Sequence, residues 1–342
     1  ITDVTVGETS VTIQGDYTGE GTFFLGEIPP FVDMFKTEKI EFKIPLSENS
    51  FSIQLDRYVT VGDFKYDRLL SKWAVFKEGA DVDELVSHAR YANVDAIHAK
   101  QSVEAVPLKS KKGLGGLINH GLLTHDLDEL GISSATINIP ISNFMHLSEQ
   151  PGDILYTYGG KTYYFNYNNY VKIFQWRAEE YRAKNIALTF EVLMSWSDAP
   201  VHQNLIYPGA RQKAGHYYYA LNVNDTSSIE MLDATFHFLT DIFGRKASFV
   251  QNWIVGNEIN MPQEYNFTGS KDLNTNVVIA TKTFDLFYKA LQDNSPYAKQ
   301  YICMTNHWNS DNNGTGIPAK NFITSFAANE KGKNWNIAYH AY

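Results

Sequence analysis

The pattern of apolar and polar residues along the chain changes near residue 79. Before that point apolar residues alternate with polar ones in short runs, such as 40–46 and 51–55, and polar turns separate the runs. Alternation of this kind is typical of strands with one covered face, so residues 1–79 are predicted to form a small all-β sandwich domain. We expect a structural role for this domain, and a sugar-binding module is the alternative.

From about residue 111 onward, strand patterns alternate with helix patterns. The predicted strands are 113–118, 135–140, 186–194, 253–255, 301–305 and 335–342, and the predicted helices are 124–130, 170–184, 227–243, 276–293 and 319–329. Residues 78–112 show no regular pattern and are interpreted as a connector. Strands that alternate with helices predict a parallel sheet.

Two folds share this alternation, a closed barrel and an open doubly wound sheet. An open sheet gathers its ligands mainly at one switch point, whereas every predicted strand here ends in a polar or aromatic cluster. The glycine run at 113–116 is not part of a phosphate-binding or dinucleotide motif. We therefore predict an α/β fold, a (β/α)8 TIM barrel over residues 80–342, preceded by the β-sandwich domain.

Composition narrows the function classes. The net charge of −9 comes without a basic block, so a nucleic-acid partner is not expected. No apolar run is long enough to cross a bilayer, and no cofactor motif is present. The single cysteine, Cys303, lies in an apolar segment and is expected to be a buried small hydrophobic residue. Aromatic residues make up 14% of the chain, which suits the stacking of sugar rings.

The segment 251–260 carries the most specific signal. It begins as an apolar strand, Trp253 to Val255, and then becomes polar with Gly256, Asn257 and Glu258. The Asn257-Glu258 pair resembles the acid/base signature of the (β/α)8 glycoside hydrolases of clan A, in which this pair closes the fourth strand. In the order of predicted strands given above, it also follows the fourth. The resemblance covers about residues 111–342. We expect the chain to belong to an uncharacterised bacterial family near that clan.

The resemblance implies a retaining glycosidase that acts on an oligo- or polysaccharide. Glu258 would be the general acid/base, and Asn257 would hold the 2-hydroxyl group of the sugar. Other residues at strand ends are candidate substrate contacts: Asn138, Trp196, His307, Trp308, His340 and Tyr342. Asn138 stands where many clan members have arginine in an Arg-Ile-Pro sequence, so the cation that usually orients the nucleophile is missing here.

The second carboxyl group is the missing part of this prediction. In the clan, the nucleophile closes strand seven, and only six strands are predicted before Tyr342. We therefore expect the chain to be a fragment, inactive alone, with the nucleophile beyond Tyr342. Asp198 and Glu264 are the alternatives within the chain, and Glu191 is placed in the barrel wall.

Two other functions remain open. One is a carbohydrate-binding protein without catalysis, and the other is a metal-dependent barrel hydrolase with Glu258, His307 and His340 as ligands. The chain begins Ile-Thr-Asp without a start methionine, which indicates a processed chain and predicts an extracellular or cell-surface location.

Overall fold

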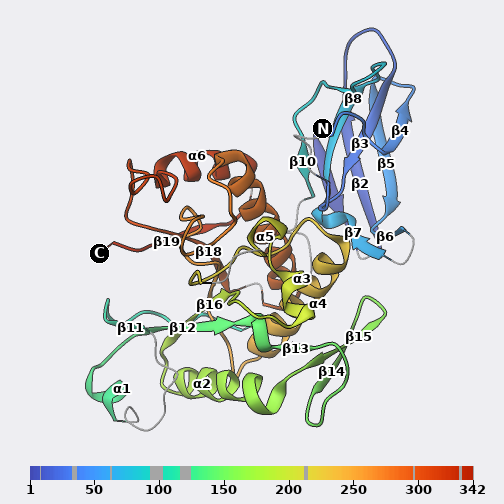
Figure 1. Cartoon of the computed structure of the whole chain (residues 1–342). Helices are drawn as coiled ribbons and strands as arrows, with labels where there is room; N and C mark the ends of the chain where they lie inside the picture. Colours follow the sequence, from blue (N-terminus) through green and yellow to red (C-terminus); the bar gives the residue numbers. More distant parts are fainter. Residues whose placement is uncertain are drawn as a thin grey trace. The chain divides into compact units, whose positions relative to one another are not determined.

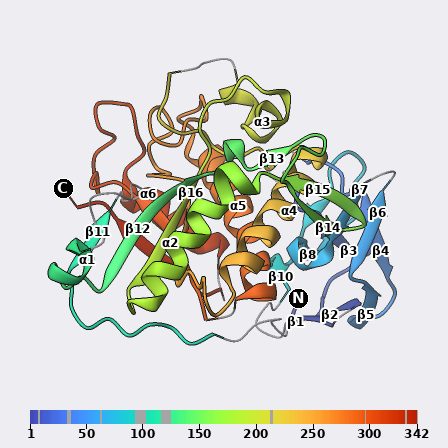
Figure 2. The ribbon, with the colours of Figure 1, turned by 90° about the horizontal axis from the view of Figure 1, so that it is seen from below.

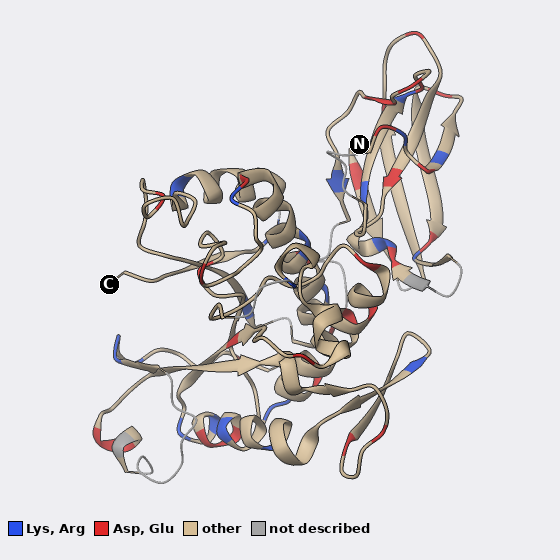
Figure 3. Cartoon of the chain, viewed as in Figure 1, with Lys and Arg blue, Asp and Glu red and all other residues tan. Residues whose placement is uncertain are grey.

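The structure is a computed structural model that describes residues 1–7, 9–32, 37–61, 64–92, 103–115, 125–211, 215–295, 297–330 and 333–341. It divides into two compact units (Figure 1). The first comprises Ile1–His98 and Val223–Glu230, and the second comprises Ala99–Asn222 and Met231–Tyr342. Acidic and basic residues occur in both units (Figure 3).

The first unit is built from antiparallel strands. They are β1 (Asp3–Val6), β2 (Ser10–Asp16), β3 (Phe23–Ile28), β4 (Phe42–Leu46), β5 (Ser50–Asp56), β6 (Tyr58–Val61), β7 (Phe64–Asp67), β8 (Lys72–Lys77), β9 (Glu84–Leu85) and β10 (Arg90–Tyr91). One sheet has the order β1-β2-β5, and a second has the order β10-β8-β3-β4 with β9 also paired to β8. Strands β6 and β7 form a separate hairpin.

Alternation decides which face of these strands is covered. In β1 and β2, the apolar positions are buried while their neighbours are half-buried or exposed. The predicted boundary at residue 79 lies inside this unit, because β9 and β10 extend the sheet beyond it by pairing with β8. Both strands are two residues long, too short to produce a readable period-two pattern.

The second unit contains a six-stranded parallel sheet. Its strands are β11 (Gly113–Gly115), β12 (Ser134–Pro140), β16 (Ala187–Leu193), β17 (Asn252–Val255), β18 (Lys299–Met304) and β19 (Asn336–Tyr339). They lie in the order β11-β12-β16-β17-β18-β19, and each pair of neighbours is parallel. The predicted parallel sheet is confirmed. A doubly wound sheet reverses its strand order at the switch point, whereas these described strands follow one another across the sheet in the order of the sequence. Figure 2 shows the helix Lys172–Ala183, labelled α2, lying beside β12 and β16.

Along the chain, helices alternate with the strands of this sheet. They are α1 (Asp126–Glu129), α2 (Lys172–Ala183), α4 (Thr226–Phe243), α5 (Leu273–Asn294) and α6 (Ala319–Asn329), and a π-turn at Tyr167–Val171 precedes α2. Each overlaps the helix predicted from the sequence. Asp272 caps α5, since its carboxylate accepts a hydrogen bond from the Thr275 backbone N–H. No described helix has both the length and the apolar character needed to cross a bilayer.

The two faces of the parallel sheet differ in chemistry. One face packs against the helices through aromatic rings: Phe190 on β16 contacts Phe174 of α2 and Phe243 of α4, and Trp253 on β17 contacts Phe287 of α5. The opposite, inner face carries polar side chains at the alternate positions. The strand register aligns Asn138, Glu191 and Ile254 across β12, β16 and β17, and it aligns Thr136, Thr189 and Asn252 two residues earlier. A polar inner face therefore leads to the carboxyl ends of the strands.

An antiparallel hairpin interrupts the alternation between β12 and α2. It consists of β14 (Ile154–Tyr158) and β15 (Lys161–Phe165), with β13 (Met145–His146) paired to β15. No element is predicted here from the sequence, although Gly159-Gly160 between two alternating runs is a hairpin signal and both glycines have positive φ. A short helix, α3 (Pro200–Leu205), was also missed because six residues show too little periodicity.

The hairpin is joined to the helices by a buried polar network. The Tyr158 hydroxyl donates to Asp233 of α4 at 3.0 Å and accepts from Lys289 of α5 at 3.0 Å. Lys289 also donates to Asp233 at 2.9 Å. Burial and the neighbouring Asp233 carboxylate raise the pKa of Tyr158 well above its usual value, so it remains a neutral donor.

Candidate active site

The segment that follows β17 has an unusual backbone conformation, with positive φ angles at Gly256 and Glu258. The Gly256 N–H donates to the Val192 carbonyl at 2.9 Å, and Gly256 then takes a φ of +84°. A Cβ at Gly256 would lie 3.0 Å from the Ile259 side chain, so glycine suits both the conformation and the space. Glu258 has a φ of +43°, which costs a non-glycine residue roughly 1–2 kcal/mol. Strain of this kind persists where the surroundings fix the chain, and it is frequent at functional sites.

Asn260 fixes this segment. Its side chain is fully buried, its amide donates to the Ile317 carbonyl at 2.9 Å, and its carbonyl oxygen accepts from the Thr305 N–H at 3.0 Å. The Ile317 N–H donates in turn to the backbone carbonyl of Asn260 at 2.8 Å. One side chain thereby ties the segment after β17 to the end of β18 and to the turn before α6. Asn260 is not among the site residues predicted from the sequence.

Glu258 contacts His340, which follows β19. The imidazole Nδ1 lies 2.9 Å from the Glu258 carboxylate, and Glu258 is 3% exposed. This hydrogen bond raises the pKa of His340, against the opposing effect of its partial burial. Two residues predicted to belong to one site, from the fourth and sixth strands of the sheet, are therefore in direct contact.

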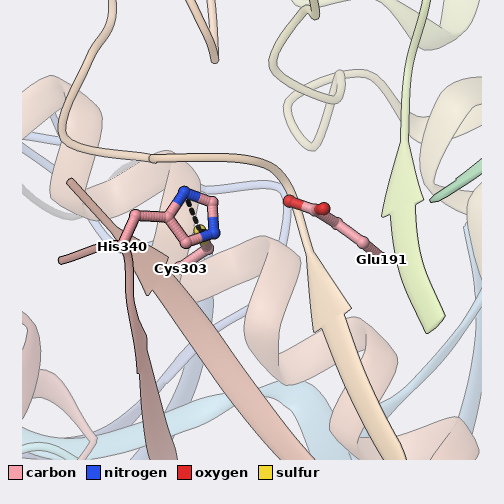
Figure 4. Close-up of side chains that lie close together, drawn as sticks. All are labelled: Glu191, Cys303 and His340. Atoms are coloured by element: carbon pink, nitrogen blue, oxygen red, sulfur yellow. Dashed lines mark hydrogen bonds between the residues drawn. The ribbon is translucent and has the colours of Figure 1, made fainter. Parts of the chain in front are cut away.

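Cys303 and Glu191 complete the cluster (Figure 4). The Cys303 thiol lies 3.3 Å from His340 Nε2 and 3.5 Å from the Asn257 carbonyl oxygen, to which it donates. The ligating atoms of Glu191, Cys303 and His340 all lie within 4.8 Å of one another. Cys303 is buried as predicted, but its neighbours are polar. Glu191 extends from the inner face of the sheet toward the other two residues.

The two carboxyl groups have different surroundings. Burial raises the pKa of Glu191 to about 7; His340 opposes this shift and the Glu258 carboxylate adds to it. Burial likewise raises the pKa of the Cys303 thiol well above its usual value. An acid that holds its proton near neutral pH, beside a second carboxyl group bonded to an imidazole, can donate and accept protons. A thiol, an imidazole and a carboxyl group could instead hold a metal ion.

Among the remaining predicted residues, Asn138 lies within β12, Trp196 lies in the loop after β16, and His307 and Trp308 lie in the loop after β18. On the inner face, the Asn138 amide donates to the Tyr218 hydroxyl at 3.3 Å. The Trp196 indole N–H donates to the exposed Asp198 at 2.9 Å, and its ring packs against Tyr219. Trp308 is 45% exposed and its ring contacts Tyr339.

Three further predictions concern Tyr342, Glu264 and the metal ligands. Tyr342 lies outside the described residues. Glu264 is half-buried in the turns that follow Met261. The predicted metal set of Glu258, His307 and His340 differs from the arrangement observed: among the described residues, His340 is grouped with Glu191 and Cys303 instead. Sequence order gave no hint of this, because strand register decides which side chains share a face.

Residues 104–342 match the family described as "Family of unknown function (DUF5722)". The chain belongs to this family. Among curated proteins, none matches the sequence of this DUF5722 member significantly.

Solved structures resemble the chain only weakly. The CBM22-1 and GH10 modules of Clostridium thermocellum xylanase Xyn10B share 14% identity over 96% of this chain and 63% of theirs, with a TM-score of 0.39. The product complex of the glycogen-degrading pneumococcal protein SpuA shares 11% identity over 98% of this chain, with a TM-score of 0.35. The chain spans only 39% of that structure. Pullulanase from Bacillus acidopullulyticus shares 8% identity over 88% of this chain and 41% of its own, with a TM-score of 0.31. These neighbours are carbohydrate-active enzymes, and all three TM-scores lie below 0.5.

Proposed function

We propose that this DUF5722 member is a retaining glycoside hydrolase that acts on an oligo- or polysaccharide, with Glu258 as general acid/base. One observation carries the proposal. A nearly buried glutamate with a left-handed backbone follows the fourth strand of a sequentially wound parallel sheet, and it is hydrogen-bonded to His340. Catalytic groups of (β/α)8 barrels lie at this end of the strands. The proposal therefore extends the described sheet to a (β/α)8 barrel of the clan A type.

In this mechanism Glu258 first protonates the glycosidic oxygen and then, as a carboxylate, removes a proton from the attacking water. His340 lies against the same carboxyl group, with Nδ1 2.9 Å from its oxygen, and this contact orients the Glu258 side chain. The Cys303 thiol holds the Asn257 carbonyl oxygen, which orients the Asn257 amide for a sugar hydroxyl. The resemblance to the clan assigns the nucleophile to the seventh strand of the barrel, whereas the described parallel sheet has six strands.

Replacement of the acid provides the test. In the full-length protein, Glu258→Gln should lower turnover of natural oligosaccharides by about 10²–10⁴-fold, because general acid assistance is worth that much. Nitrophenyl glycosides, whose leaving groups need little protonation, should be affected less. Glu129→Gln is the matched control, since it removes an exposed carboxyl group from α1. Full turnover of natural substrates by Glu258→Gln would refute the assignment.

Carbohydrate binding without turnover is the alternative outcome of that experiment. The exposed ring of Trp308 favours a sugar contact near the site in either case. We propose that the first unit is an accessory β-sandwich to the catalytic unit, and that the protein works outside the cell or at its surface. Proteolysis that removes the strands β1 to β10 while turnover persists would support the accessory role.

A further inference from the structure

The cluster of Glu191, Cys303 and His340 has a chemistry that acid catalysis does not require. Sulfur, imidazole nitrogen and carboxylate oxygen come from three different strands or strand ends of one sheet and converge on its inner face (Figure 4). The hydrogen bond to Asn257 accounts for the thiol alone, but not for the grouping of its sulfur with an imidazole and a second buried carboxyl group. These three donor atoms are, in contrast, the usual ligand types of zinc.

The spacing of the donor atoms suits a metal ion. Zinc bonds of about 2.0–2.3 Å at tetrahedral angles place neighbouring ligand atoms roughly 3.3–3.7 Å apart. The Cys303 sulfur and His340 Nε2 are already 3.3 Å apart. With Glu191, the three donor atoms lie within 4.8 Å of one another. A shift of the Glu191 carboxylate by about 1 Å is therefore enough to bring all three to the spacing that zinc ligands have.

The imidazole is oriented as a ligand. Zinc-binding histidines commonly donate their second ring N–H to a carboxylate, which fixes the tautomer and increases the basicity of the ligating nitrogen. His340 places Nδ1 2.9 Å from Glu258, and its Nε2 faces the thiol. Glu258 is thus positioned to orient the ligating histidine.

The surroundings of the Glu191 carboxyl group independently indicate a binding site for an ion. The residue is 6% exposed, and its buried Oε1 has no hydrogen-bond partner among the described residues. A buried carboxyl oxygen without a partner is costly, and an ion in front of it would remove that cost.

We propose that Glu191, Cys303 and His340 bind one zinc ion on the inner face of the sheet, with the fourth coordination position open to water or a substrate oxygen. Thiolate with imidazole favours zinc over magnesium or calcium, which prefer oxygen ligands alone. Zinc enters as the thiol proton and the proton of the Glu191 carboxyl group leave to solvent, and the resulting thiolate and carboxylate carry the two negative charges that the ion neutralises. The site exists whether or not the protein is a glycosidase. If the proposed function holds, the ion would withdraw Glu258 from acid catalysis and inhibit the enzyme.

The experiment uses the intact protein, stripped with a chelator and then titrated with Zn²⁺ against a chromophoric competitor. One equivalent should bind. Co²⁺ in place of Zn²⁺ should give a thiolate-to-cobalt charge-transfer band in the near ultraviolet. Cys303→Ser should abolish that band, and Glu191→Gln and His340→Gln should each weaken zinc binding by more than about 100-fold. Glu258→Gln should weaken it by about 10–100-fold and keep the band, since Glu258 acts only through His340.

Glu264→Gln serves as the control and should bind zinc like the wild type. Circular dichroism and melting temperature establish that each variant is folded, and Cys303→Ala replaces Cys303→Ser if the latter does not fold. Cobalt binding without the thiolate band, or a Cys303 variant with wild-type zinc affinity, would overturn the proposal. Neither outcome touches the glycosidase assignment, which is read from turnover by the chelator-stripped protein.

Discussion

Replacement of Asn260 by alanine should destabilise the second unit more than any surface substitution. The Asn260 side chain is the partner of the Thr305 N–H and of the Ile317 carbonyl, and both of those residues are nearly buried. Alanine would leave these two backbone groups without a partner. Each buried backbone group without a hydrogen-bond partner costs about 1–3 kcal/mol, so the total loss in unfolding free energy is about 2–6 kcal/mol.

Urea unfolding measures this loss directly. Trp253 is fully buried on β17, close to Asn260 in sequence, and its fluorescence reports on the region. For a domain of this size, the melting temperature should fall by on the order of 5–20 °C. Asn321→Ala, at an exposed position of α6, is the control and should change stability by less than about 0.5 kcal/mol.

A second substitution at the same position separates the two hydrogen bonds. Asn260→Asp keeps the acceptor for the Thr305 N–H but places an oxygen against the Ile317 carbonyl. Aspartate should therefore be destabilising at neutral pH, and part of the loss should be recovered in acid, where the protonated carboxyl group can donate again. If Asn260→Ala unfolds at the same urea concentration as Asn321→Ala, the reasoning about this residue is wrong.

Two further predictions concern buried charges in the second unit. Burial and Asp285 raise the pKa of Glu330 to about 8 although Lys333 lies beside it. The folded state thus holds a proton that the unfolded state releases near pH 4.5, and stability should fall as the pH rises from about 5 to 8. Glu330→Gln should flatten that fall in melting temperature, and an unchanged profile would contradict the shift. Tyr158→Phe removes the hydroxyl that donates to Asp233, and it should cost about 1–3 kcal/mol in urea unfolding while turnover persists; a smaller loss than 0.5 kcal/mol would mean that water replaces the bond.

The parallel sheet was predictable because each of its strands carries a local signal. Apolar runs flanked by helical periodicity gave all six strands and their direction, and they placed Glu258 after the fourth. The strand order and the contact of Glu258 with His340 agree with that reading. Local signals were sufficient here, since parallel strands end at one edge of a sheet.

The other two members of the cluster around Glu258 and His340, namely Glu191 and Cys303, were not predictable from the sequence. Whether Glu191 faces the helices or the inner surface depends on the register of β16 with its neighbours, which no local pattern encodes. Cys303 lies in an apolar segment and gave only a burial signal. Asn260 is one of many asparagines, and its role depends on contacts with residues far along the chain.

The sequential strand order also bears on how the protein is made. Each strand of the parallel sheet from β12 to β19 pairs with the sheet strand that the ribosome has synthesised just before it. The sheet can therefore grow at one edge during translation, without waiting for a distant segment to emerge. Pairings of moderate sequence separation close faster than those that join chain ends. The cluster around Glu258 is an exception, because its last member, His340, emerges after every strand that supplies the others.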